Sequence, residues 1–204
     1  MRIWGYGEDA LTYWALSMHM AEVIRQSPLD DDSPTDNIVL MYRPSFGRAG
    51  GRRSAQFGEF DAIVGTPRAV YLIETKWTGE PIFKGQVRLA EQQIRRHQIF
   101  HWIRDRWLQQ APANWAAFYT RNVADFTERF EGKPLAEPGR RLASNLEYVL
   151  QQLGSAGEPT KDVLLYFCLK GDAAPQGVAE GSSFSVVPFT YHPELGVRII
   201  DMQT

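Results

Sequence analysis

The chain is poor in cysteine and in long apolar runs. Its 204 residues include one cysteine, Cys168, so neither a disulfide framework nor a cysteine-based zinc site can form within it. The longest apolar run, from Val163 to Leu169, has seven residues, whereas a membrane-spanning helix needs about 20. The N-terminus lacks the basic stretch and unbroken apolar segment of a secretory signal, and acidic residues begin at Glu8. We therefore expect a cytoplasmic protein without a membrane partner.

The composition is that of an ordinary globular protein. Apolar residues make up 44% and charged residues 23%, close to the averages for soluble domains, which excludes a disordered or collagen-like chain. No repeat or low-complexity segment stands out. At this length we predict a single domain over residues 1–204. Within it, residues 1–108 would form a motif-bearing core, 109–161 a helical elaboration and 162–204 later strands of the sheet.

Charge is unevenly distributed, although the net charge is only −2. The first 42 residues carry a net charge of −5 and the last 98 carry −3, whereas the segment between them carries +6. Within this basic segment, Arg48, Arg52 and Arg53 are interspersed with glycines in the loop 45–58. Such a loop is suited to contact phosphate groups. A solvated turn is the alternative interpretation.

Hydrophobic periodicity predicts a mixture of helices and strands. Apolar residues three or four positions apart indicate helices over the segments 8–26, 82–108, 115–130 and 142–153. Short β-rich runs between turn residues indicate strands over the segments 37–42, 58–65, 69–77, 162–170, 183–191 and 196–201. A helix, three strands, further helices and later strands are typical of an α/β domain with a mixed β-sheet flanked by helices.

Two acidic residues and a lysine fall on two neighbouring predicted strands. If residues 66–69 form a four-residue turn, Asp61 lies directly opposite Glu74. Such cross-strand neighbours share a face, with Cβ atoms about 5 Å apart, and Lys76 shares that face because side chains alternate along a strand. Two carboxylates this close repel each other unless a cation lies between them, and their oxygens suit a hard divalent ion such as Mg²⁺. The sequence therefore predicts a metal site on this hairpin.

These residues resemble the signature of the PD-(D/E)XK nucleases, which have an Asp on one strand and a Glu-any-Lys triplet on the next, between two helices. The matching segments are FDAIV at 60–64 and IETKW at 73–77, and the resemblance spans roughly residues 7–108. One departure is Phe60, which stands where the signature has proline. The resemblance implies a restriction-endonuclease-like core with the order α-β-β-β-α-β, here with an inserted helical segment and extra C-terminal strands.

The resemblance also implies a role for each residue of the motif. Asp61 and Glu74, with the carbonyl of Thr75, would bind Mg²⁺, for which Mn²⁺ would substitute. Lys76 would orient or help activate the attacking water in the hydrolysis of a phosphodiester. A second Glu-any-Lys triplet, at 131–133, precedes a proline and ends a helical pattern, so it has no strand partner. The alternative for the first triplet is a surface hairpin with exposed ion pairs, which stabilise little.

Further candidates lie on the two predicted helices beside the motif. In this family an acidic residue on the first helix often completes the metal site, and we select Glu8 over Glu22, although an acid near a helix start also interacts favourably with the helix dipole. On the helix after the motif, the side chains that could meet a phosphate backbone or support the site are Lys84, Arg88, Gln92, Arg95 and Arg96. An ordinary solvated face is the alternative.

Two other features have more ordinary interpretations. His97 and His101 have a spacing that can hold zinc, but without a third ligand we expect them to pack or to lie at the surface. Trp77 could stack on a base. Strand alternation instead favours its burial beneath the sheet, on the face opposite Glu74.

From the motif and the resemblance together we expect a metal-dependent nuclease that acts on DNA rather than RNA. One alternative is a non-catalytic module that keeps the fold and binds nucleic acid or another partner. Another is a subunit of a defence or repair complex, in which residues 109–204 form a docking surface. The sequence leaves the oligomeric state open, with a homodimer as one candidate.

Overall fold

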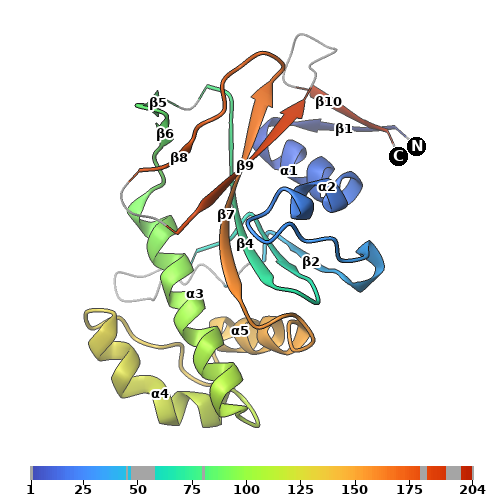
Figure 1. Cartoon of the computed structure of the whole chain (residues 1–204). Coiled ribbons are helices and arrows are strands. Elements are labelled where there is room, and N and C mark those ends of the chain that lie inside the picture. The colour runs from blue at the N-terminus through green and yellow to red at the C-terminus, as the bar shows by residue number, and fades with distance from the viewer. Residues whose placement is uncertain are drawn as a thin grey trace.

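Five strands form a mixed β-sheet at the centre of the molecule (Figure 1). The structure is a computed structural model that describes residues 2–44, 46, 58–79, 81–179, 183–191 and 199–203. In sheet order the strands are β2 (Val39–Tyr42), β3 (Ala62–Gly65), β4 (Val70–Trp77), β7 (Thr160–Leu169) and β9 (Ser185–Tyr191). Strands β2, β3 and β4 are antiparallel, whereas β4, β7 and β9 are parallel. The expected α/β class with a mixed sheet flanked by helices is confirmed.

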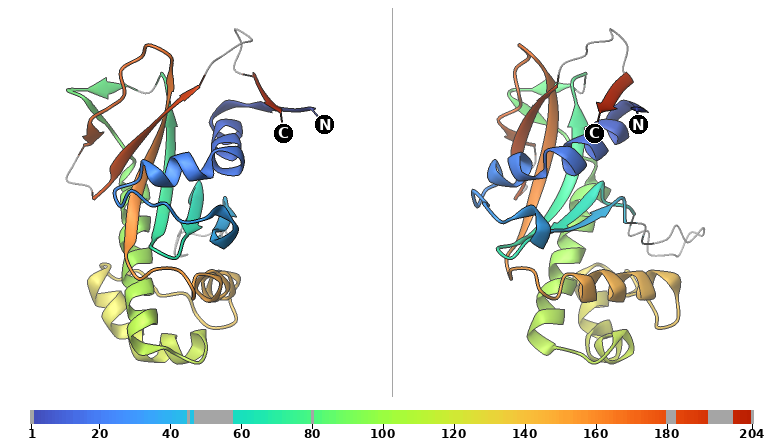
Figure 2. Two further views of the ribbon diagram at one scale, coloured as in Figure 1. Left: turned by 45° about the vertical axis from the view of Figure 1, so that its right-hand side comes forward. Right: turned by 90° about the vertical axis from the view of Figure 1, so that its right-hand side faces the viewer.

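Helices cover both faces of this sheet (Figure 2). One face carries α1 (Gly7–Met18) and α2 (Met20–Arg25), whose apolar residues pack on Val64, Tyr71 and Ile73. The other face carries α3, α4 and α5, and these extend from Glu91 to Gln110, Trp115 to Arg129 and Arg141 to Gln152. Side chains from these three helices share one apolar cluster with Ile63 and Leu72 of the sheet. The inserted helical segment, α4 and α5, therefore packs against the sheet and shares its hydrophobic core.

Two smaller sheets lie at the periphery. One pairs β1 (Arg2–Tyr6) with β10 (Ile199–Gln203) in antiparallel fashion, so that the two ends of the chain lie side by side (Figures 1 and 2). The other contains β5 (Ile82–Phe83), β6 (Gln86–Val87) and β8 (Gly177–Val178). A single 3₁₀ turn, η1 (Thr35–Asn37), precedes β2. Among the described residues, no helix is long and apolar enough to cross a membrane.

Most predicted elements are present, and β2, β4, β7, β9, α4 and α5 begin and end within two residues of their predicted positions. The N-terminal helix differs, because the segment predicted as one helix over 8–26 is divided at His19, whose backbone leaves the helical conformation at φ −127° and ψ 24°. The His19 ring packs against Trp14 and Phe189, with ring centroids 4.6 and 5.5 Å away. Strand β1 was not predicted.

The helix predicted over 82–108 starts later than expected, at Glu91. The segment before it is the β5–β6 hairpin, whose turn residues Lys84 and Gly85 both have positive φ angles, 51° and 77°. Two consecutive residues with positive φ form the two-residue turn that matches the twist of a hairpin. Lys84 and Arg88 were predicted on the helix, and this placement was wrong because the turn at Lys84 and Gly85 interrupts the helical pattern.

The β3–β4 hairpin has the predicted register, with Gly65 opposite Val70 and Ala62 opposite Ile73. Its turn is held from the side by Asp31, a fully buried residue of the acidic loop before β2. The Asp31 carboxylate accepts hydrogen bonds from the hydroxyls of Thr66 at 2.6 Å and Tyr71 at 2.8 Å. Because the turn determines the register, these bonds also determine which side chains face each other at the open end of the hairpin.

Candidate active site

Asp61 and Glu74 come together at the open end of the β3–β4 hairpin, as the register predicts. Asp61 lies one residue before β3, and its Oδ2 accepts hydrogen bonds from the amide nitrogen and the hydroxyl of Thr75, at 2.7 and 2.9 Å. Burial raises the pKa of Asp61, and the negative charge of Glu74 raises it further. The two acids are thus close enough for their negative charges to repel each other.

Lys76 and Glu8 lie beside each other, with 4.0 Å between the Lys76 Nζ and the Glu8 Oε1. Their side chains are 19% and 28% exposed, so both are accessible from solvent. Glu8 is in the first turn of α1. Glu22, the other candidate acid, is an exposed residue of α2 whose Oε1 accepts a hydrogen bond from Gln26 at 3.3 Å. The fold therefore brings Glu8, and not Glu22, to the lysine of the motif.

Arg43, which the sequence did not single out, connects these elements. Its amide nitrogen donates to the carbonyl of Asp61 at 3.0 Å. Its guanidinium donates to the carboxylates of Asp9 in α1 and Glu59 before β3. One residue at the end of β2 thereby ties the start of α1 to the segment that carries Asp61.

The carboxylate of Glu74 is enclosed by donors from α3. The residue is 1% exposed. Its Oε2 accepts a hydrogen bond from Gln93 at 2.5 Å, and its Oε1 accepts from Arg96 and from the Nε2 of His97, the latter at 3.1 Å. Burial alone would raise the pKa of Glu74, but the bond from His97 and the charge of Arg96 outweigh burial and lower it. Glu74 is therefore held in its ionised form.

His97 joins Glu74 to a second buried acid, Asp162 of β7. The His97 Nδ1 lies 2.7 Å from Asp162 Oδ1, and the same oxygen lies 2.8 Å from the Nε2 of His101. Burial alone would lower the pKa of His97, but the bonds to Asp162 and Glu74 raise it. Conversely, burial would raise the pKa of Asp162, and the bonds from His101 and His97 lower it. A chain of hydrogen bonds thus runs from Glu74 through His97 and Asp162 to His101.

Aromatic rings and a hydroxyl enclose this chain. The His97 ring lies between Phe60 and Phe184, with ring centroids 4.9 and 4.5 Å away, and Ser183 donates its hydroxyl hydrogen to Asp162. Phe60 also lies under the Arg96 guanidinium, 5.1 Å from the ring centroid. Phe60, which stands where the signature has proline, therefore packs against Arg96 and His97, and both of these residues bond to Glu74.

The remaining predicted residues lie on α3, in the segment before it and in the loop 45–58. Gln92 is exposed, and its neighbour Gln93 is the glutamine that reaches Glu74. Arg96 was expected to meet a phosphate backbone or to support the site, and its side chain, which is 10% exposed, is paired with Glu74. Lys84 and Arg88 are exposed in the segment before α3. The loop arginines Arg48, Arg52 and Arg53 lie outside the described residues.

Trp77 lies at the end of β4, and the two histidines lie on α3. Trp77 is partly buried against the cluster on the α1 side of the sheet, so its predicted position on the face opposite Glu74 is confirmed. His97 has a packed position, as predicted, but the sequence did not indicate its bonds to Glu74 and Asp162. The spacing of His97 and His101 placed them on one helix face. Nothing in the sequence linked that face to Asp162, which is 65 positions from His97.

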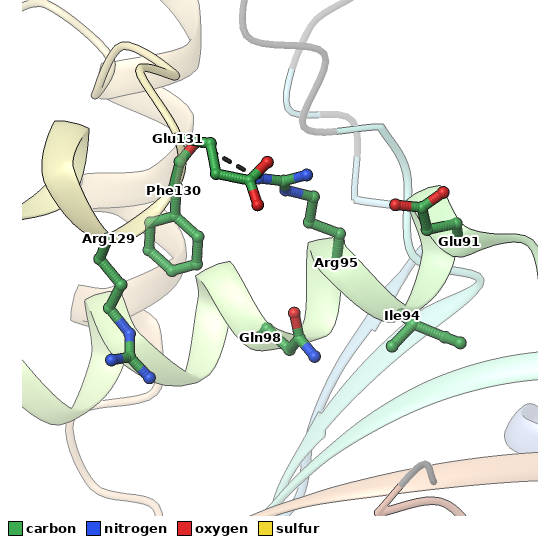
Figure 3. A pocket seen from close by; sticks show the side chains of 7 residues that line it. All are labelled: Glu91, Ile94, Arg95, Gln98, Arg129, Phe130 and Glu131. Carbon is green, nitrogen blue, oxygen red and sulfur yellow. Dashed lines mark hydrogen bonds and ion pairs between the residues drawn. The ribbon is translucent and has the colours of Figure 1, made fainter. Parts of the chain in front are cut away.

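A separate pocket of about 360 Å³ lies on the outward side of α3, where it meets the end of α4 (Figure 3). Arg95 donates there to Glu131 at 2.9 Å and to the carbonyl of Phe130 at 3.3 Å. The lining also includes Gln98 and Arg129. None of the residues around Asp61 and Glu74 lines this pocket. It is therefore distinct from the candidate site.

The described residues contain no group of three or more His, Cys, Asp or Glu side chains arranged to hold a metal ion. The oxygens that could serve as ligands at the candidate site are those of the Asp61–Glu74 pair and the neighbouring Thr75 carbonyl. The donors beside Glu74 include Arg96 and His97, and Lys76 follows Glu74 by two residues on β4. No protein-family model matches this chain, and no match was found among curated proteins or solved structures.

Proposed function

We propose that this protein is a metal-dependent nuclease that hydrolyses phosphodiester bonds, in DNA rather than RNA. The observation that carries the proposal is the buried acid pair, because burial raises the pKa of Asp61 and the charge of Glu74 raises it further. Two acids held in this way destabilise each other unless a cation binds between them. A fold that brings them together has the features of a binding site, although Arg96 and His97 already offset the charge of Glu74.

The arrangement of elements supports a restriction-endonuclease-like core. Leaving aside α2, the 3₁₀ turn and the short strands of the two peripheral sheets, α1 is followed by β2, β3 and β4, then by α3 and finally by β7. This is the order α-β-β-β-α-β, with α4 and α5 inserted before β7 and with β9 after it. The motif residues lie at the end of the β3–β4 hairpin, between the first helix and α3.

The donor set fits a hard divalent cation, because the carboxylates of Asp61 and Glu74 and the carbonyl of Thr75 all present oxygen atoms. A carboxylate must be ionised to act as a ligand, and His97 and Arg96 hold Glu74 in that form. Mg²⁺ would be the natural ion, with Mn²⁺ as a substitute. When bound, it would lower the pKa of a water molecule and offset negative charge on the phosphate.

Lys76 would act on the water or on the phosphate. An ammonium group has three N–H donors and no lone pair, so it cannot be a metal ligand. Glu8, 4.0 Å from the Lys76 Nζ, would orient that ammonium through its negative charge. The N–H donors of Lys76 would hold the attacking oxygen or bind a phosphate oxygen as its charge develops.

The test is to titrate the protein with Mn²⁺ by calorimetry and to assay cleavage of plasmid and oligonucleotide DNA in Mg²⁺. Asp61→Asn should abolish both metal binding and cleavage, because one hard ligand is neutralised. It should leave the fold intact and its stability at pH 7 unchanged or higher, because the repulsion of Glu74 is removed. Equal Mn²⁺ affinity of wild type and variant would contradict the metal site.

A second candidate function has one specific observation in its favour. Both oxygens of Glu74 already accept hydrogen bonds, from Gln93, Arg96 and His97, so α3 supplies the positive charge that a metal would otherwise provide. On this alternative the protein is a non-catalytic module that keeps the fold. Arg96→Ala distinguishes the two. In a nuclease it should preserve or strengthen Mn²⁺ binding, because it frees the Glu74 oxygen from Arg96 while the bond from His97 still favours the ionised form, whereas the non-catalytic module binds no Mn²⁺ with or without Arg96.

A further inference from the structure

The β5–β6 hairpin presents an aromatic side chain to solvent. Phe83 is 71% exposed, more than any other large hydrophobic side chain among the described residues, and its neighbour Ile82 is 39% exposed. Phe83 pairs with Gln86 across the hairpin, and Ile82 pairs with Val87. Because the side chains of a cross-strand pair share one face, Phe83 and Gln86 form an exposed face of aromatic and amide groups. The opposite face carries Ile82 and the buried Val87.

The hairpin is anchored to the rest of the molecule, so this exposure is not that of a fraying segment. Strand β6 pairs in parallel with β8, and the Val87 carbonyl accepts a hydrogen bond from the amide of Ala179 at 2.8 Å. The Gly85 carbonyl, in the turn itself, accepts from the amide of Gln176 at 2.7 Å. Val87 is 1% exposed and belongs to a cluster with Leu164 and Tyr166 of β7. Such contacts hold Phe83 in a defined position.

The charge of the hairpin suits an anionic ligand. Between Ile82 and Val87 the single charged residue is Lys84, and Arg88 follows directly. The Lys84 Nζ lies 5.3 Å from the centroid of the Phe83 ring. The acids nearest to the hairpin in sequence are Glu80 and Glu91. An aromatic ring, an amide and an ammonium on one small surface are the groups that stack on a base, bond to its edge and contact its phosphate.

The hairpin follows the carboxyl end of β4, where Lys76 lies (Figure 1). Ile82 is six residues after Lys76, so their Cα atoms are at most about 20 Å apart. At the spacing of one strand of duplex DNA, that distance corresponds to about six nucleotides. A strand of this length therefore reaches from the hairpin to Lys76, the lysine proposed to act on the water or the scissile phosphate.

We propose that the β5–β6 hairpin binds single-stranded DNA, with a base stacked on Phe83 and the adjoining phosphates at Lys84 and Arg88. This inference rests on the proposed nuclease function and adds to it the form of substrate next to the cleavage site. Stacking needs an unpaired base, because both faces of a base within a duplex are already covered by its neighbours.

The experiment measures fluorescence anisotropy of a labelled oligothymidine bound to Asp61→Asn protein, which should not cleave it. Adding Phe83→Ala should weaken binding about tenfold, the loss typical of one stacked base, and Phe83→Trp should restore it. A matched control is Tyr148→Ala, because Tyr148 of α5 is an aromatic residue of similar exposure, 62%, and should not change the affinity. Lys84→Ala should reduce the salt dependence of log affinity by about 0.7.

An abasic oligonucleotide of equal length separates stacking from phosphate contact. It should bind more weakly and should not respond to Phe83→Ala. Equal loss on abasic and normal strands, or no loss on either, would overturn the stacking role. The second result would be expected if the hairpin bound a protein partner instead. The Mn²⁺ affinity of the Phe83→Ala single variant, measured by calorimetry, should equal that of wild type. If Phe83 proves not to stack on a base but Mn²⁺ still binds, the stacking proposal is contradicted and the proposed nuclease function is not. A wild-type protein that binds neither metal nor DNA refutes both proposals.

Discussion

Lys76 is the residue whose replacement tests the proposed chemistry most directly. Lys76→Ala should lower single-turnover cleavage by about a hundredfold or more, the usual cost of losing an electrostatic donor in a transition state. Mn²⁺ affinity should be retained or should increase, because a positive charge beside the acid pair has been removed. Lys76→Arg should not restore the full rate, because a planar guanidinium does not reproduce a compact ammonium.

The matched control for Lys76 is Lys161→Ala. Lys161 pairs in register with Tyr71, near the other end of β4, and its loss should leave both cleavage and metal binding unchanged. Near-normal cleavage by Lys76→Ala would mean that Lys76 is only an ion-pair partner of the acids around it.

Asp162 should stabilise the fold more than any surface ion pair. It is 5% exposed and accepts hydrogen bonds from His97 and His101, so Asp162→Asn leaves a buried imidazolium with one acid partner fewer. Breaking a buried pair in this way typically costs about 3–5 kcal/mol. Urea unfolding at pH 6, followed by tryptophan fluorescence, should reveal a loss of this size, and a change below about 1 kcal/mol would place Asp162 among ordinary exposed pairs.

The pH dependence of stability follows from the same residues. The pKa of Asp162 is lowered in the fold, so its contribution is present above its unfolded pKa of about 3.9 and is lost as the pH falls through the folded value. The pKa of His97 is raised, so its contribution is complete below its unfolded pKa of about 6.5 and is lost as the pH rises through the folded value. The free energy of unfolding should therefore be highest between about pH 4 and 6.5.

Unfolding titrations across that range, for wild type and Asp162→Asn, are the measurement. For the variant, the free energy of unfolding should fall less as the pH is lowered, because Asp162 no longer contributes to that fall. Its alkaline decline should begin at lower pH, because His97 has lost a partner that raised its pKa. Parallel pH profiles for the two proteins would contradict this assignment.

At the scale of elements, the β3–β4 turn packs closely against the connection between α5 and β7. A Cβ atom added at Gly157 would lie 2.1 Å from the backbone carbonyl atoms of Arg68, and the Gly157 amide donates to the Thr66 carbonyl at 2.9 Å. Gly157→Ala should therefore force the turn and the connection apart. Overpacking of this kind costs about 1–3 kcal/mol, and the displaced turn should also weaken Mn²⁺ binding, since it determines the position of Asp61.

Gly177→Ala in β8 is the control for this prediction. A Cβ atom there meets nothing within 4 Å, so the free energy of unfolding should change by less than about 0.5 kcal/mol. If both alanine variants have the same stability, the contact between the turn and the connection does not constrain the hairpin.

At the scale of the whole molecule, the motif-bearing part cannot be separated from the rest. Strand β4 carries Glu74 and pairs along its length with β7, from Val70 opposite Thr160 to Trp77 opposite Phe167. A fragment ending at Leu108 lacks β7 and β9, and it also lacks the α4 and α5 side chains that cover Ile63 and Leu72. We expect this fragment to be unfolded by circular dichroism and to bind no Mn²⁺, whereas cooperative thermal unfolding of the fragment would show that the first strands and α3 suffice.

The sequence by itself determined the hairpin and the motif. Turn residues at 66–69 and strand alternation up to Lys76 predicted that Asp61 would face Glu74, and the register agrees. That prediction succeeded because pairing in a hairpin is counted outward from a local turn. The α/β class and most element bounds were predictable for a similar reason, since periodicity over a few residues records which side of each element is buried.

Only the tertiary structure decided what surrounds the motif. The bonds from Gln93, Arg96 and His97 to Glu74 join residues 19 to 23 positions apart, and Asp162 lies 65 positions from His97. Which face of α3 points inward depends on where that helix starts. The apolar spacing suggested a start at residue 82, but the positive φ angles at Lys84 and Gly85 form a turn there, and the helix starts at Glu91. Contacts of this kind follow from how separate elements pack, and packing is not encoded in any one local stretch of sequence.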